Sequence, residues 1–334
     1  IIVLGGSFAG LSAAHHFLDH VIQQLSTFEG APRYRVILVS PSTHLYWNIC
    51  APRALVSADL IPVESAFVPI EPGFSRHPFN EFTYMQGAAT AIDTSARTVT
   101  VILASEATTK HSVLQTLPYH ALILATGSSA YSPLYSLHGS YEKTTAELRS
   151  FHARLETAQS VLIVGGGPSG VETAGQLATY FNRRPAPRTP KTITILSGSE
   201  QLLPKLAPGI GHKAAKKLKS LGVHVVHNIR QVGSSENPDG STNCHLNNDM
   251  TITADVVIAA TGVYPNTSYL PTSMLDEAGY IVTDPEVLRV YGHGVGERVY
   301  AIGDCASYSK NYVLDVYEAV PILMHNLCND LLAH

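Results

Sequence analysis

The feature that most constrains this chain is a glycine-rich turn that occurs twice. Residues 1–10 read IIVLGGSFAG and residues 161–170 read VLIVGGGPSG, and each copy joins an apolar run to an alanine-rich stretch. Strand–turn–helix segments of this kind bind a dinucleotide, because glycines let the backbone approach the phosphates and the first helical N–H groups are free donors. Two copies predict two dinucleotides, and electron transfer between them is the common reason for binding two.

Composition narrows the class of protein further. The 334 residues are 45% hydrophobic and 14% charged, which predicts a sizeable core divided between two domains. The net charge of -4 makes nucleic acid an unlikely partner, because phosphate binding needs a basic surface. No apolar run is long enough to span a bilayer, and no signal peptide is visible. The chain begins inside an expected strand and ends inside an expected helix, so we expect both ends to be trimmed and the C-terminal segment to be incomplete.

The cysteines and histidines suggest neither a disulfide framework nor a metal site. No two of the four cysteines form a CxxC or zinc-type pair, which indicates a reducing compartment. The sixteen histidines show no metal-ligand spacing, so we predict no metal. Cys50 is interpreted as a small buried residue, and a lone reactive thiol is the alternative.

The first glycine turn departs from the usual dinucleotide fingerprint at two positions. Ser7 takes the place of the middle glycine, and Ser40 takes the place of the acid that usually binds the ribose hydroxyls. The irregular stretch 41–60 follows, and it contains the only tryptophan, Trp47. This stretch either packs as an aromatic loop over the first domain or lines the cofactor, with Arg53 near phosphate or flavin.

The second turn leaves the choice between NADH and NADPH open. An acid after the second strand of this unit indicates NADH, whereas an arginine indicates the 2′-phosphate of NADPH. The strand expected at 192–196 is followed by Ser197-Gly198-Ser199-Glu200, with neither group at the expected point. The basic, proline-rich stretch 183–190 is interpreted as a loop, and the lysine-rich helix expected at 210–221 as a solvated face.

A second internal repetition supports duplication. ILATG at residues 123–127 recurs as IAATG at 258–262, and YAIGD at 300–304 ends a further strand in an acid. Periodicity predicts helices at 11–25, 144–159, 171–181, 210–221 and 315–332. It predicts strands at 1–4, 34–39, 82–86, 98–103, 121–124, 192–196, 223–227, 254–260 and 299–304, and a hairpin over 231–250.

Taken in order, GGSFAG, ILATGS, GGGPSGVE, IAATG and YAIGDCA resemble the FAD- and NAD(P)-binding flavoproteins of the pyridine nucleotide-disulfide oxidoreductase type. Residues 48–54 (NICAPRA) and 165–172 are most similar to the apoptosis-inducing-factor-like, ferroptosis-suppressor branch, the NAD(P)H:quinone reductases. The resemblance implies an α/β fold with two Rossmann-like dinucleotide-binding domains in a glutathione-reductase-like architecture. It places a discontinuous FAD-binding domain at 1–127 and 263–334, with an NAD(P)H-binding domain at 128–262 inserted between them.

The resemblance also implies roles for individual residues. FAD would lie on Gly5, Gly6, Ser7, Phe8, Ala9, Gly10, Ser40, Arg53, the backbone of Ala89, Thr126, Gly127, Asp304 and Val316. Asp304 would bond the ribitol chain, and the helix start around 316–318 would face the flavin pyrimidine. NADH or NADPH would lie on Gly165, Gly167, Pro168, Ser169, Gly170, Thr261 and Gly262. Glu172 would position the nicotinamide and so affect catalysis; the alternative is a carboxylate that only complements the helix dipole.

The implied activity is that of an FAD-dependent NAD(P)H oxidoreductase. Hydride would pass from nicotinamide to flavin, and electrons would leave to a quinone-type acceptor. The redox-active cysteine pair of the disulfide-reducing relatives is absent, which excludes their chemistry. The alternatives are an oxygen-using flavin oxidase or monooxygenase, and a redox-gated signalling flavoprotein of the apoptosis-inducing-factor type. We expect a cytoplasmic protein, or one peripheral to a mitochondrial or lipid-droplet surface and held there through a missing C-terminal segment.

Overall fold

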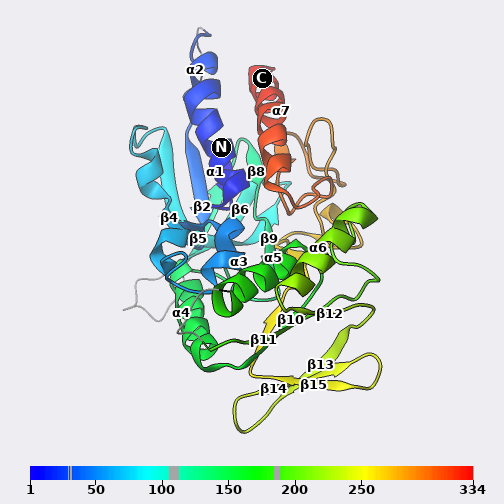
Figure 1. The fold of residues 1–334 in the computed structure, drawn as a ribbon. Coiled ribbons are helices and arrows are strands. Elements are labelled where there is room, and N and C mark those ends of the chain that lie inside the picture. Colours follow the sequence, from blue (N-terminus) through cyan, green and yellow to red (C-terminus); the bar gives the residue numbers. More distant parts are fainter. Residues whose placement is uncertain (29, 31, 105–112, 184–188, 334) are drawn as a thin grey trace.

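The computed structural model describes residues 1–28, 30, 32–104, 113–183 and 189–333, and shows a mixed α/β fold (Figure 1). Its largest sheet has the strand order β18-β8-β1-β2-β5-β6-β7. The part from β18 to β5 is parallel, and β6 and β7 continue it in antiparallel fashion. The strands are β1 (Ile2–Leu4), β2 (Val36–Ser40), β5 (Phe82–Asp93), β6 (Thr98–Leu103), β7 (Leu114–Pro118), β8 (Leu122–Leu124) and β18 (Val299–Ala301).

A long helix packs over β1 and continues the first glycine turn. It consists of α1 (Phe8–His16), a π-helical turn η1 (Phe17–Val21) and α2 (Ile22–Leu25), so the helix expected at 11–25 is confirmed and begins earlier. Beside it runs α7 (Val313–Leu332), which continues through Pro321 (Figure 1). The apolar faces of both helices share one core with β1 and β8. Within the described residues, no helix is both long and apolar enough to cross a membrane.

A second parallel sheet has the order β12-β11-β10-β16. Its strands are β10 (Ser160–Val164), β11 (Thr192–Leu196), β12 (His224–Val226) and β16 (Val256–Ala259). The helices around it are α4 (Tyr141–Thr157), α5 (Pro168–Leu177) with its π-helical turn η5 (Ala178–Asn182), and α6 (Pro208–Ser220). This sheet therefore repeats, on a smaller scale, the arrangement around β1.

The hairpin expected over 231–250 is confirmed and extended. β13 (Gln231–Glu236) and β14 (Thr242–Leu246) turn at the expected point, and β15 (Thr251–Ala254) adds a third strand. The extra turn is possible because Asp249 adopts a positive φ of 63°, a conformation that aspartate tolerates better than most residues. Of the expected basic loop at 183–190, residues 184–188 lie outside the described residues.

Short elements lie outside the two parallel sheets. They comprise β3 (His44–Tyr46), η2 (Asn48–Cys50), α3 (Ala51–Ala54), η3 (Val63–Ala66), β4 (Phe67–Pro69), η4 (Glu71–Phe74), β9 (Ser128–Ala130), β17 (Val263–Pro265) and η6 (Thr272–Met274). α3 packs on α5, and one core cluster contains residues of both. The Tyr46 hydroxyl donates to the Leu134 carbonyl at 2.8 Å. The stretch that carries Trp47 and Cys50 is thus fixed between the two sheets.

Candidate functional site

The two glycine turns have the same geometry. We call β1, α1, β2 and β8 the first unit, and β10, α5, β11 and β16 the second unit. Gly5 has a φ of +117°, and a Cβ there would lie 2.1 Å from the carbonyl oxygen of Ala125. A Cβ on Gly10 would lie 1.8 Å from the Gly5 carbonyl oxygen. The corresponding contacts at Gly165 and Gly170 are 2.1 and 2.0 Å. These glycines are required because helix, turn and neighbouring strand meet without room for a side chain.

Both turns leave the helix N-terminus open to a ligand. Ser7 and Gly167 are the N-cap residues, and neither caps its helix through a side chain. Ser7 is exposed, and a Cβ on Gly167 would meet nothing within 4 Å. Pro168 fits the first helical position, which has no intrahelical use for an N–H. Uncapped N–H groups at a helix start favour an anion, so both turns fit a dinucleotide pyrophosphate.

A serine stands at the end of the second strand of each unit and packs against the glycine turn of that unit. Ser40 is 3% exposed, and its hydroxyl donates to the Ser42 carbonyl at 3.0 Å. In the second unit Ser197 is 1% exposed and donates to the Gln201 carbonyl at 3.0 Å. Each hydroxyl also fills the space beside a turn glycine, Gly6 in the first unit. The hydroxyl of Ser40 is therefore committed to local structure, and its predicted contact with a cofactor stays a prediction.

Asp304 is held beside the first glycine turn. A Cβ on Gly303 would lie 2.7 Å from the Cβ of Ala9 and 3.8 Å from Val316 Cγ2, so this turn is wedged between the starts of α1 and α7. The Ser128 hydroxyl donates to Asp304 Oδ2 at 2.9 Å. Burial raises the pKa of the half-buried Asp304 carboxyl, and Asp315 adds to the rise. The first unit therefore presents an acceptor suited to a ligand hydroxyl.

The start of α7 also lies beside the first glycine turn, next to Asp304. Asp315 accepts hydrogen bonds from the backbone N–H groups of Lys310, at 2.7 Å, and Tyr312, at 3.4 Å. The Val316 side chain is only 4% exposed and packs into the core that α1 and α7 share. Val316 therefore fixes the helix start against α1 through its side chain. A contact with a cofactor would have to involve its backbone or its neighbours.

The repeated Ala-Thr-Gly segments are covered to very different degrees. The Thr126 hydroxyl donates to the Asn266 carbonyl at 2.7 Å, and the Asn266 amide donates back to the Thr126 carbonyl at 3.0 Å. Gly127 is half-buried beneath this segment. Thr261 and Gly262, at the equivalent point of the second unit, are exposed.

The aromatic stretch lies beside the first turn. The rings of Phe8 and Trp47 meet edge to face with centroids 5.2 Å apart, and Trp47 is still 42% exposed. Arg53 is exposed on α3. Burial raises the pKa of the neighbouring Cys50 thiol, and the positive charge of Arg53 lowers that pKa by a smaller amount. Ala89 lies on β5 opposite Val101, next to an irregularity in the ladder. The stretch thus both packs as a loop and borders the first turn.

Glu172 lies two residues beyond the second turn, on the exposed side of α5. Partial desolvation raises the pKa of its carboxyl. Within the part of the chain that the structure describes, this carboxylate forms no ion pair. The adjacent Thr173 is fully buried and bonds the Tyr135 hydroxyl at 2.7 Å, which fixes this helical turn. Glu172 is therefore rigidly placed but free to meet a ligand on the second unit.

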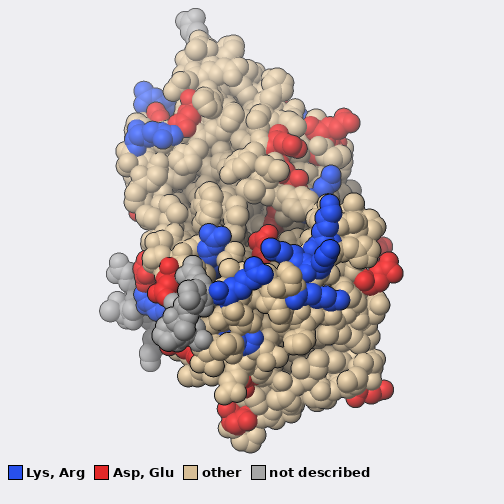
Figure 2. All heavy atoms as spheres, in the orientation of Figure 1, with Lys and Arg blue, Asp and Glu red and all other residues tan. Residues whose placement is uncertain are grey.

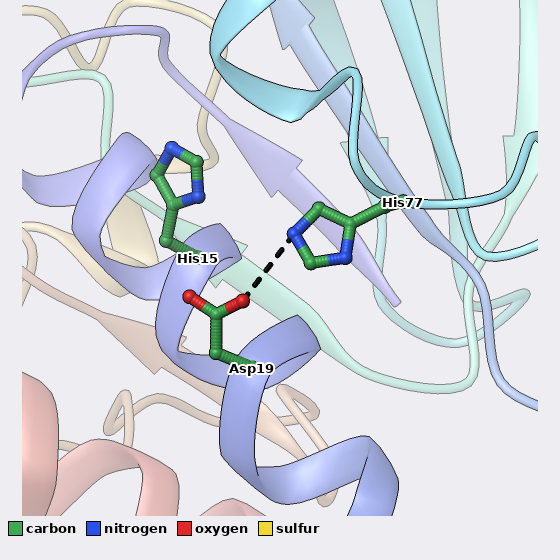
Figure 3. Close-up of side chains that lie close together, drawn as sticks. All are labelled: His15, Asp19 and His77. Atoms are coloured by element: carbon green, nitrogen blue, oxygen red, sulfur yellow. Dashed lines mark ion pairs between the residues drawn. The ribbon is translucent and has the colours of Figure 1, made fainter.

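Outside these turns, His15 and Asp19, one helical turn apart, come together with His77 from a distant part of the chain (Figure 3). Their ligand atoms lie within 4.8 Å of one another. His77 Nε2 is 3.4 Å from Asp19 Oδ1, and Arg76 binds the other carboxylate oxygen at 2.5 Å. The Arg76 guanidinium already supplies the positive charge that a cation would bring. We therefore describe an ion-pair cluster, which sequence spacing missed, and the absence of a metal stays a prediction.

All four cysteines are free, namely Cys50, Cys244, Cys305 and Cys328. Cys50 is half-buried on η2, and burial raises the pKa of its thiol, which disfavours the reactive thiolate. The other three cysteines are buried. The interpretation of Cys50 as a packing residue is thus favoured over a reactive thiol.

Sequence reasoning missed two residues of this site, Ser128 and Asn266. Ser128 directly follows the Ala-Thr-Gly segment, so its position was a usable signal. Asn266 was not recognisable, because its contact with Thr126 joins residues 140 positions apart.

Comparisons with known proteins agree with this geometry. The chain is 36% identical over 345 residues to the oxidoreductase phnG of Penicillium herquei, covering 99% of this chain and 80% of that protein. It is 27% identical over 323 residues to ferroptosis suppressor protein 1 of Xenopus tropicalis, covering 92% of this chain and 74% of that protein. The solved NAD-dependent persulfide reductase from A. fulgidus superposes with a TM-score of 0.72 at 21% identity, covering 98% of this chain and 59% of that one.

The family model described as pyridine nucleotide-disulphide oxidoreductase matches residues 1–322. This match extends over both glycine turns and the Asp304 segment. The chain therefore belongs to the pyridine nucleotide-disulphide oxidoreductase family, whose oxidoreductases use FAD with NADH or NADPH.

Proposed function

We propose that the protein oxidises NAD(P)H through FAD and passes the electrons to a quinone-type acceptor. The observation that carries the proposal is the pair of matching glycine turns, the first of which lies beside the Asp304 carboxylate and the start of α7. FAD belongs on the first unit and the nicotinamide dinucleotide on the second. The domain division is part of the proposal, with residues 1–127 and 263–334 holding FAD and residues 128–262 holding the nucleotide.

When bound, FAD supplies the chemistry that accepts a hydride and releases electrons. The residues of the chain bind and orient the two dinucleotides. The uncapped starts of α1 and α5 would each hold a pyrophosphate, and Asp304 would accept a bond from the ribitol chain. Glu172 would orient the nicotinamide, because accurate alignment of donor and acceptor is the main demand of hydride transfer.

The quinone acceptor rests on two arguments. Cys50 has no cysteine partner, so electrons cannot leave through a redox-active disulfide. The likeness to the ferroptosis-suppressor branch favours a quinone over other direct acceptors. Because a lipophilic quinone lies in a membrane, we propose that the protein binds a membrane surface peripherally.

The test is an anaerobic stopped-flow experiment. The purified protein is mixed with NADH or NADPH, and the visible absorbance of the flavin is followed before and after a soluble ubiquinone analogue is added. We expect rapid bleaching followed by rapid recovery with quinone. Recovery with O2 but not quinone would replace this proposal with an oxidase, and failure to recover with either would favour a redox-gated signalling role.

A further inference from the structure

The end of β11 lacks the acid that would select NADH. In this architecture the ribose of the adenosine half lies at the carboxyl end of the second strand, where an acid binds the 2′-hydroxyl or an arginine binds a 2′-phosphate. Ser197 occupies that point, and its buried hydroxyl is used by the Gln201 carbonyl. The first carboxylate in the segment, Glu200, comes three residues later and is exposed.

An arginine from a distant part of the chain lies at this point instead. Arg230 is so close to Gly198 that a Cβ there would lie 3.0, 3.1 and 3.2 Å from its Cγ, Nε and Cζ atoms. The guanidinium therefore lies directly against the backbone that follows β11. Only a glycine leaves room for this approach without displacing the arginine.

The backbone that carries Arg230 is fixed from both sides. Ile229 donates its N–H to the Ser197 carbonyl at 3.0 Å, and Asn228 donates to the Ser199 carbonyl at 3.1 Å. The Arg230 N–H donates to the side-chain oxygen of Asn247 at 3.0 Å. Its carbonyl accepts the N–H of Asn247, also at 3.0 Å. The backbone at Arg230 is thus held in place by the fold before any ligand arrives.

Arg230 is charged and open to solvent. It is exposed, and among the residues that the structure describes it forms no ion pair. Helix α6, which packs on β12 and α5, carries Lys213, Lys216, Lys217 and Lys219. Figure 2 shows lysine and arginine side chains gathered where Figure 1 draws α6. The exposed guanidinium of Arg230 matches a doubly charged phosphate.

We propose that Arg230 binds the 2′-phosphate of NADPH and makes the second unit selective for NADPH over NADH. This inference rests on the proposed function, because it assumes that the nicotinamide dinucleotide lies on the second glycine turn. NADH offers only a hydroxyl at this point, so it leaves the guanidinium without a charged partner. The expected preference is roughly 10- to 100-fold in kcat/KM, as for a bidentate charge-assisted contact.

The first test measures flavin reduction by NADPH and by NADH in the wild-type protein and in Arg230→Ala and Arg230→Lys. Arg230→Ala should lower kcat/KM for NADPH roughly 10- to 100-fold and bring the NADPH/NADH ratio toward one. Arg230→Lys should retain part of the preference, because a lysine keeps the charge but loses the planar fork. Arg33→Ala is the matched control, because it removes an exposed arginine that lies just before β2, outside the second unit, and should leave the ratio unchanged. A wild-type preference for NADH, or a ratio unaffected by Arg230→Ala, would overturn the proposal.

A second measurement uses binding alone. Isothermal titration with 2′,5′-ADP and with 5′-AMP should show tighter binding of 2′,5′-ADP, and Arg230→Ala should abolish the difference. Glu200→Gln tests the rival reading, since a strong loss of NADH use in this variant would assign the ribose contact to Glu200. If neither probe binds and neither nucleotide bleaches the flavin, the proposed function itself fails. Equal binding of both probes with normal bleaching refutes only the role of Arg230.

Discussion

The two glycine units have the same backbone geometry, but different residues cover their turns. In both, the same pair of turn glycines closes against an Ala-Thr-Gly segment, and the helix that follows contains a π-helical turn. In the first unit this segment is bonded to Asn266, and Asp304 and the start of α7 lie beside the turn. In the second unit Thr261 and Gly262 are exposed.

This difference suggests how one motif can serve two ligands with different lifetimes. A covered site with a half-buried carboxylate suits a resident group such as FAD, because dissociation would require several contacts to be broken. An open site suits a nucleotide that must bind, react and leave in each turnover. The predictions below test this division between a resident and an exchanging site.

The largest effect is expected at the close-packed glycines. Gly10→Ala forces a Cβ to within 1.8 Å of the Gly5 carbonyl oxygen. We therefore expect the free energy of unfolding to fall by roughly 3 kcal/mol and the bound flavin to be lost. Gly170→Ala makes a matching contact of 2.0 Å with the Gly165 carbonyl oxygen and should cost similar stability, but it should leave a yellow protein that NAD(P)H no longer reduces. Thermal denaturation and the visible spectrum measure both effects. Loss of flavin from Gly170→Ala, with Gly10→Ala unaffected, would reverse the assignment of the two units.

The second-largest effect is expected at Asp304, on the affinity for FAD. Asp304→Asn keeps the shape of the side chain and removes its charge, so we expect FAD to bind about tenfold more weakly, which corresponds to one lost charge-assisted hydrogen bond. Ser128→Ala removes the neighbouring hydroxyl but leaves the carboxylate, and should have a smaller effect. Fluorescence titration of the apoprotein with FAD gives both constants. Equal affinities in the wild-type protein and Asp304→Asn would show that the carboxylate does not contact the cofactor.

Glu172 tests the exchanging site. We expect Glu172→Gln to lower kcat/KM for NAD(P)H about tenfold with normal flavin content, because the residue aligns the nicotinamide. If Glu172 only complements the helix dipole, the variant will instead lose about 0.5 kcal/mol of stability and keep its kinetics. Stopped-flow reduction together with thermal denaturation separates the two outcomes.

The smallest effect is a pH dependence that arises at His15, on α1 of the first unit. Burial lowers the pKa of His15, Arg76 and His77 lower it further, and Asp19 opposes them. A histidine with a lowered folded-state pKa binds fewer protons folded than unfolded, so stability falls as the pH drops below the ordinary value of 6.5. The second unit has Gly175 at the equivalent place. His15→Phe keeps the stacking on Phe74 and should reduce the loss of unfolding free energy between pH 7.5 and pH 5.5 by about 1 kcal/mol or less, as measured by thermal denaturation at the two pH values. An unchanged pH profile would refute the role of His15.

Local sequence patterns predicted much of the fold. The apolar run before each glycine turn and the spacing of apolar residues in 11–25 are local signals, and the structure confirms both elements. β7 and β15 were not predicted, because short, largely polar edge strands have weak patterns.

Contacts between distant residues could not be predicted. Arg230 reaches Gly198, and Asn266 reaches Thr126, only because strand order brings these segments together. His77 meets Asp19 for the same reason. Ser40 was predicted from its sequence position to contact a ligand, yet its hydroxyl completes a local turn, and no spacing rule distinguishes these uses.

The ribbon of β9 and β17 has a mechanical consequence. β9 follows the Ala-Thr-Gly segment of the first unit, β17 follows that of the second, and the two strands pair antiparallel with Val263 opposite Ala130. The chain therefore crosses between the units twice, along one line. Two crossings that are bonded to each other resist twisting more than bending. A rotation of residues 128–262 relative to the first unit would therefore take place about one axis, the line of the β9–β17 ribbon. In the proposed function, such a rotation would bring the nicotinamide back to the same position in every turnover.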